Sequence, residues 1–135
     1  MATQLYIPFF KNPIIDLSWG YVPFIIFTVI AISNSVNIAD GIDGLAVVPV
    51  AFAIAVYGVF AYVSSHAEIS DFLIFPFVPG VGEVAIICCI VFGACLGFLW
   101  FNSYPANIIM GDAGSMALGG LLGTVVVLIK HEVLF

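Results

Sequence analysis

Residues 84–101 read VAIICCIVFGACLGFLWF, an apolar run that contains no charged residue. An α-helix of roughly 20 such residues crosses a hydrocarbon layer about 30 Å thick. The run ends at Trp100 and Phe101, and aromatic rings are common where a helix leaves the bilayer. This stretch therefore predicts a transmembrane helix.

Three more apolar runs lie at residues 17–33, 44–63 and 113–130. Across the 135 residues, 64% are hydrophobic and 7% are charged, whereas soluble domains carry about 25% charged residues. The pattern predicts an all-α fold: a polytopic transmembrane bundle of about four helices, forming a single membrane domain over residues 1–135.

Acidic residues outnumber basic ones, with eight acids against Lys11 and Lys130 and a net charge of -6. No basic patch is present to hold a nucleic acid, so we expect no nucleic-acid partner, and an anionic ligand would need a metal ion. Cys88, Cys89 and Cys95 have no His or carboxylate at ligand spacing. We therefore interpret these cysteines as small core residues rather than zinc ligands or disulfides.

Two pairs of glycines, Gly93 with Gly97 and Gly119 with Gly123, have the small-xxx-small spacing that lets membrane helices approach closely. Both pairs predict helix packing contacts.

The polar residues gather in two segments, residues 34–43 and 102–112, which we predict to be loops. One follows the first predicted helix and the other follows the third, so an even number of membrane crossings separates them. Both loops are therefore expected on the same membrane face.

The first loop carries Asn34, Asn37, Asp40 and Asp43 at intervals of three, with Gly41 among them. Residues three apart are neighbours on a helical surface, so successive members of this row can point into one cavity.

The second loop places Asp112 between Gly111 and Gly114, at the predicted start of a helix, where backbone N–H groups can bind phosphate. Asp40, Asp43 and Asp112 have no Lys or Arg near them in the sequence, which makes a cation the natural partner. Oxygen ligands without His or Cys favour Mg²⁺ or Mn²⁺. Asp43 or Asp112 taken alone could instead be a helix N-cap, but the two loops together favour a metal and phosphate site.

Three stretches carry a family resemblance: NSVNIADGIDGLA at 34–46, FLWFNSYPA at 98–106 and MGDAGSMALGG at 110–120. With FFKNP at 9–13, they closely resemble the phospho-N-acetylmuramoyl-pentapeptide transferases, members of the polyprenyl-phosphate sugar-1-phosphate transferase superfamily. The resemblance covers nearly the whole chain.

The resemblance implies Mg²⁺-dependent transfer of phospho-MurNAc-pentapeptide from UDP-MurNAc-pentapeptide to undecaprenyl phosphate, which yields lipid I and UMP for peptidoglycan synthesis. By matching positions, Asp112 is the expected magnesium ligand and, with Asp40 and Asn37, a catalytic residue. The expected substrate-binding residues are Asn34, Asn37, Asp40, Gly41, Asp43, Asn102 and Ile109.

The sequence departs from the family in two ways. Ile109 stands where the family usually has an aromatic residue that stacks on uracil, which predicts weaker nucleoside binding. Family members also have about ten transmembrane helices, a paired-Asp motif with a Lys, and a His-rich loop. We therefore expect a central part of the family fold that is inactive alone and is completed by the remaining helices or a homodimer.

The family implies a multi-pass protein of the bacterial cytoplasmic (inner) membrane, in contact with membrane lipid, whose motif loops face the cytoplasm. Lys11 and Lys130 alone would favour the opposite orientation by the positive-inside rule. Two other functions stay open: a UDP-GlcNAc:polyprenyl-phosphate GlcNAc-1-phosphate transferase, and a non-catalytic ion-binding membrane bundle.

Overall fold

Four long helices account for most of the fold in the computed structural model, which describes residues 4–5, 15–16, 18–41, 45–75 and 77–130. They are α1 (Tyr21–Ala39), α2 (Val47–Ser65), α4 (Gly82–Asn102) and α5 (Gly111–Leu128). Each is long and apolar enough to cross a membrane. The predicted all-α bundle of four transmembrane helices is therefore confirmed.

Three short elements complete the described chain. Strands β1 (Gln4–Leu5) and β2 (Ile15–Asp16) pair antiparallel, with Gln4 opposite Asp16, and a 3-10 turn, η1 (Ser18–Gly20), leads into α1. Helix α3 (Ala67–Phe72) lies between α2 and α4.

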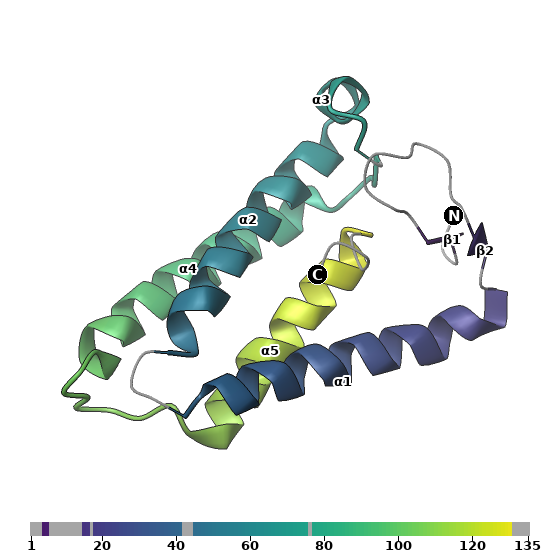
Figure 1. The fold of residues 1–135 in the computed structure, drawn as a ribbon. Coiled ribbons are helices and arrows are strands. Elements are labelled where there is room, and N and C mark those ends of the chain that lie inside the picture. The colour runs from purple at the N-terminus through teal and green to yellow at the C-terminus, as the bar shows by residue number, and fades with distance from the viewer. Residues whose placement is uncertain (1–3, 6–14, 17, 42–44, 76, 131–135) are drawn as a thin grey trace.

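The long helices form two antiparallel pairs, α1 with α5 and α2 with α4 (Figure 1). Helix α2 also contacts α5, and the main buried cluster lies where the two pairs meet, including Ile54, Leu122 and Val126. Large apolar side chains are exposed on the outer faces, among them Phe27 and Phe52. Such a surface is suited to lipid as solvent rather than to water.

Glycines bring α1 and α5 unusually close together. A Cβ built on Gly119 would lie 2.7 Å from the Cα of Ser33, and one on Gly123 would lie 3.1 Å from the Cα of Val29. The Ser33 Oγ donates a hydrogen bond of 2.9 Å to the Met116 carbonyl across the same contact. The predicted packing role of Gly119 and Gly123 is therefore confirmed.

The other predicted pair, Gly93 and Gly97, makes no such contact. A Cβ on either residue would meet no atom within 4 Å. In α4 the close approach is at Cys88 instead, whose Cβ lies 3.0 Å from the position of a Cβ on Gly58. The prediction of a contact at Gly93 and Gly97 is wrong within the described chain, because α4 turns a different face toward α2.

The first predicted polar loop, residues 34–43, is helical up to Ala39, so its predicted start is wrong. Asn34 and Ser35 donate their side-chain hydrogen bonds to carbonyls one turn back in α1, at 2.9 and 2.8 Å. The polar groups are thus satisfied within the helix, which has no reason to end at them. The four predicted helix ranges otherwise differ by a few residues at their ends.

The cysteines were expected to be small core residues, and two of the three are buried. Cys88 and Cys95 are buried, Cys89 is exposed, and all three are free thiols. Exposure of Cys89 on a membrane-spanning helix costs little, because a thiol behaves as a small apolar group.

We predict that Gly119→Ala destabilises the bundle by about 1–3 kcal/mol, because the added methyl would force the backbones of α1 and α5 apart. Reversible unfolding in mixed micelles with increasing SDS, followed by circular dichroism, measures the loss. Gly120→Ala is the matched control, since its Cβ would meet no atom within 4 Å. Equal stability of the two variants would contradict the prediction.

Candidate active site at one end of the bundle

The two polar segments meet at one end of the bundle, as the parity of crossings predicts. The end of α1, the start of α2, the end of α4 and the start of α5 all lie together at the lower left of Figure 1. Trp100 and Tyr104 are exposed by 83% and 88% at this end, which suits a membrane–water boundary.

A hydrogen bond joins the two motifs directly. The Ser115 Oγ, fully buried in the second turn of α5, lies 2.7 Å from the Asn37 Oδ1 in the last turn of α1. The two residues are 78 positions apart in the chain. Ser115 belongs to the second motif, but sequence reasoning did not select it, because a serine inside a helix ordinarily bonds its own backbone.

The contacts along α1 and α5 fix the register of the antiparallel pair. Gly123 meets Val29, Gly119 meets Ser33, and Ser115 bonds Asn37. One further turn along α1 reaches Asp40, and one turn back along α5 reaches Asp112. Asp40 and Asp112 therefore stand at about the same level of the pair, one turn beyond the hydrogen bond that joins the motifs.

No basic side chain of the described chain is placed to neutralise these acids. Lys130 lies at the other end of the α1–α5 pair, where its Nζ donates to the Tyr21 hydroxyl at 2.6 Å and lies 4.2 Å from the ring centroid. The other lysine, Lys11, is outside the described residues.

Asp112 is exposed in the first turn of α5, and Asp40 is half-buried directly after α1. The N-cap of α5 is Met110, and no side chain caps that helix, so the alternative role of Asp112 as an N-cap is wrong. A carboxylate in a first turn still interacts favourably with the helix dipole.

Glycines allow the tight entry into α5. Gly111 has a φ of +68°, in the left-handed region that residues with a Cβ rarely adopt. A Cβ on Gly114 would lie 2.5 Å from the Met110 Cγ. The glycines on either side of Asp112 therefore serve the backbone turn that presents it.

Asn102 holds the second loop in place. It is the last residue of α4 and is 3% exposed, and its Nδ2 donates to the Ile108 carbonyl at 2.8 Å. The Asn107 and Ile108 amides both donate to the Phe101 carbonyl, at 2.9 and 3.3 Å. The loop is thus folded back on the end of α4, with a cis peptide at Tyr104–Pro105.

The remaining predicted residues differ in position. Gly41 and Ile109 are exposed at the motif end, and Ile109 is 75% exposed. Asn34 bonds its own helix rather than the second motif. Asp43 is outside the described residues. Within the described ranges, no group of three or more His, Cys, Asp or Glu forms a metal cluster. Asp40 and Asp112 are the described carboxylates of the two motifs.

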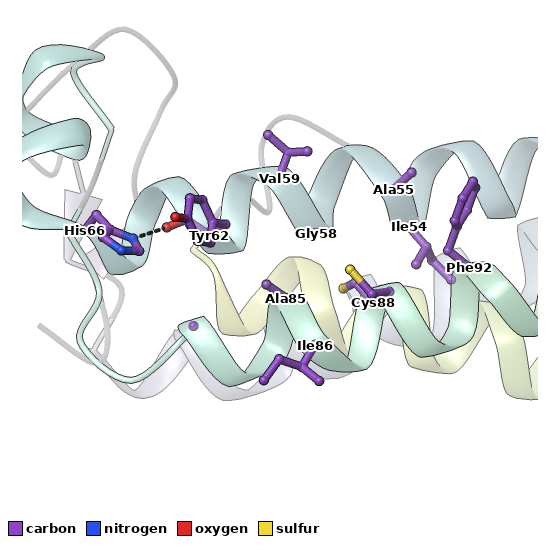
Figure 2. Close-up of a pocket in the computed structure, with 12 residues that line it drawn as sticks. Ile54, Ala55, Gly58, Val59, Tyr62, His66, Ala85, Ile86, Cys88 and Phe92 are labelled. Carbon is purple, nitrogen blue, oxygen red and sulfur yellow. Dashed lines mark hydrogen bonds between the residues drawn. The ribbon is translucent and has the colours of Figure 1, made fainter.

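A groove of about 640 Å³ between α2 and α4 has a different chemistry (Figure 2). Its lining is almost wholly apolar, apart from Tyr62 and His66 at one end. The His66 Nδ1 lies 3.0 Å from both the Tyr62 carbonyl oxygen and the Ser65 Oγ. No carboxylate lines the groove, which distinguishes it from the motif end.

Membrane-spanning helices and an acidic, glycine-rich end define a class of multi-pass membrane protein with a polar site at one bilayer face. The family model described as glycosyl transferase family 4 matches residues 1–130. The chain belongs to that family.

Three relatives are named phospho-N-acetylmuramoyl-pentapeptide-transferase. The chain is 51% identical to the protein of Pelagibacter ubique over 131 residues, which is 97% of this chain and 36% of the relative. It is 50% and 51% identical over 133 residues to those of Citrifermentans bemidjiense and Nitratidesulfovibrio vulgaris, covering 98% of this chain and 37% of each relative. The chain therefore spans little more than a third of these proteins, and the expected partial copy of a longer fold is confirmed.

We predict that Asn102→Ala loosens the second loop, because the Ile108 carbonyl loses the side-chain amide that donates to it. A hydrogen bond of this kind contributes about 0.5–1.5 kcal/mol, so hydrogen exchange at the Asn107 amide should accelerate by about two- to tenfold. Asn107→Ala is the control, since its side chain is exposed and its backbone bond to Phe101 remains. Unchanged exchange in Asn102→Ala would show that the amide does not hold the loop.

Proposed function

We propose that this chain carries part of the active site of a Mg²⁺-dependent transferase that moves phospho-MurNAc-pentapeptide from UDP-MurNAc-pentapeptide to undecaprenyl phosphate, forming lipid I and UMP. The observation that supports the proposal is the bond between Ser115 and Asn37, which sets Asp40 and Asp112 level at one end of the bundle. The names of the similar proteins support the same reaction.

In this reaction an oxygen of the lipid phosphate attacks the sugar-linked phosphorus of the UDP-sugar. The bond between that phosphorus and the bridging oxygen breaks, and UMP leaves with the bridging oxygen. Such a transfer asks the protein mainly to hold the reacting groups in line and to neutralise charge.

The donor set at the motif end fits a divalent cation. Two carboxylates without a basic partner in the described chain are ligands of the kind that Mg²⁺ accepts. Magnesium is often held by one or two carboxylates together with substrate phosphates. Asp112 would hold the ion, with Asp40 beside it. When bound, the ion would supply charge neutralisation for the diphosphate.

The described residues have separate tasks in this proposal. Asn37 and Asp40 face the substrate at the end of α1, and the exposed Ile109 lies beside the nucleoside. The backbone of Gly111 and the first turn of α5 offer N–H groups to phosphate. The lipid phosphate reaches the site from the bilayer, with the motif end at the cytoplasmic face of the inner membrane.

We predict that UDP and Mg²⁺ bind cooperatively to the purified chain in lipid nanodiscs. Calorimetry should show Mg²⁺ affinity rising at least fivefold when UDP is saturating, because the ion and the diphosphate share the site. Asp112→Asn should abolish this coupling.

Glu83→Gln is the matched control, because Glu83 is likewise an exposed acid in the first turn of a long helix but lies at the opposite end of the bundle. If the Mg²⁺ affinity of the unmodified chain does not change with UDP, the alternative function of a non-catalytic ion-binding bundle is favoured. Equal coupling in Asp112→Asn and Glu83→Gln would overturn the proposed metal site.

We further predict that the chain alone, supplied with Mg²⁺, UDP-MurNAc-pentapeptide and undecaprenyl phosphate, releases no UMP above background. The sequence contains no adjacent pair of aspartates and only two histidines, so the further essential residues implied by the family are not among its 135 residues. UMP release that Asp112→Asn abolishes would contradict this expectation. Replacing the matching block of the Pelagibacter relative by this chain tests whether the block supports transfer in a complete protein, and competition with UDP-GlcNAc tests the choice of sugar.

A further inference from the structure

Ser115 has a choice of hydrogen-bond acceptors. Its Oγ lies 2.7 Å from the Asn37 Oδ1, 3.3 Å from the Gly111 carbonyl and 3.2 Å from the Asp112 carbonyl. All three neighbours are acceptors and a hydroxyl has one proton, so the shortest contact identifies Asn37 as the principal acceptor. The serine is fully buried, where a neutral hydrogen bond is worth most.

This bond determines which end of the Asn37 amide is available to a ligand. The oxygen and the nitrogen of a carboxamide point in different directions, so an oxygen held by Ser115 leaves the two N–H donors to point elsewhere. Within the described residues, the Asn37 Nδ2 donates to no protein atom. Asn37 is half-buried and one turn from the level of Asp40 and Asp112.

We propose that Ser115 is a positioning residue: by donating to the Asn37 Oδ1, it holds the Asn37 amide so that it presents N–H donors to an acceptor oxygen of the nucleotide substrate. The assignment rests on the proposed function and extends it to a residue that contacts no substrate itself. Without the bond the amide can rotate and present its oxygen, which repels a phosphate or carbonyl oxygen.

The geometry of α1 and α5 explains why a serine can do this. Gly119 and Gly123 let the two backbones approach, and Ser115 continues the same row of α5 one turn nearer the motif end. At this separation a short side chain spans the gap to Asn37. The close packing of the helices and the orientation of the amide are thus two results of one contact.

The test is a double-mutant cycle on UDP affinity in saturating Mg²⁺, measured by calorimetry on the chain in nanodiscs. Ser115→Ala should weaken UDP binding by about five- to tenfold, the effect of losing one hydrogen bond. In the Asn37→Ala background, Ser115→Ala should have no further effect, because the serine acts through the asparagine. Additive losses would overturn the positioning role and indicate a general effect on folding.

A second variant and a second readout guard against a packing defect. Ser115→Cys keeps nearly the same volume and replaces the hydroxyl by a weak donor, so it should weaken UDP binding in the same direction. The side-chain amide NMR signals of Asn37, identified by their loss in Asn37→Ala, should move in Ser115→Ala without any ligand. Unmoved signals would overturn the proposal whether or not UDP binds.

Two competitors locate the acceptor oxygen. If it belongs to the diphosphate, Ser115→Ala weakens the binding of inorganic pyrophosphate, and if it belongs to the nucleoside, the variant weakens the binding of uridine. An effect on neither would overturn the proposal. If the unmodified chain binds no UDP at all, the proposed function itself is overturned. If UDP binding needs Asp112 but not Ser115, only this inference is overturned.

Discussion

The close approach of α1 and α5 is the contact on which the rest of the site depends. Two glycines of α5 remove the side chains that would hold the helices apart, and the Cβ position of Gly119 lies nearer to the α1 backbone than a real Cβ could. Because the contact fixes the register, it also decides which residues stand opposite one another at the end of the pair. Asp40 and Asp112 stand at about the same level for that reason, although 71 residues of the chain lie between them.

Charge gives this end of the bundle its chemical character. In a chain with 7% charged residues, Asp40 and Asp112 lie at one end of the bundle, and the described lysine, Lys130, lies at the other end, where it donates to the Tyr21 hydroxyl. Isolated acids near hydrocarbon are costly, so their presence without a basic neighbour points to a ligand that is supplied from solution. The groove of about 640 Å³ between α2 and α4 offers apolar surface with Tyr62 and His66 at one end and no carboxylate, so it does not share this chemistry.

Much of this could be predicted from the sequence. Apolar length alone identifies the four helices, because the bilayer sets the number of residues that a crossing needs. Counting crossings brings the motifs to one face, as Asp40 and Asp112 show.

Helix ends are harder to predict, because Asn34 and Ser35 bond their own backbone and let α1 continue through a polar stretch. Which glycines pack could not be predicted either, since Gly93 and Gly119 have the same spacing pattern and only the three-dimensional arrangement separates them. The bond from Ser115 to Asn37 depends on the register of α1 against α5, so no local sequence pattern predicts it.

The pairing of α1 with α5 has a consequence for synthesis. Asn37 and Ser115 are 78 residues apart, and α2 and α4 are made between them. At about 5–20 residues per second, the ribosome needs roughly 4–16 s to travel that distance. Throughout that interval α1 lacks the helix against which it packs, because α5 has not yet been translated. The nascent chain must therefore keep the polar end of α1 at the lipid surface or beside the insertion machinery until α5 arrives.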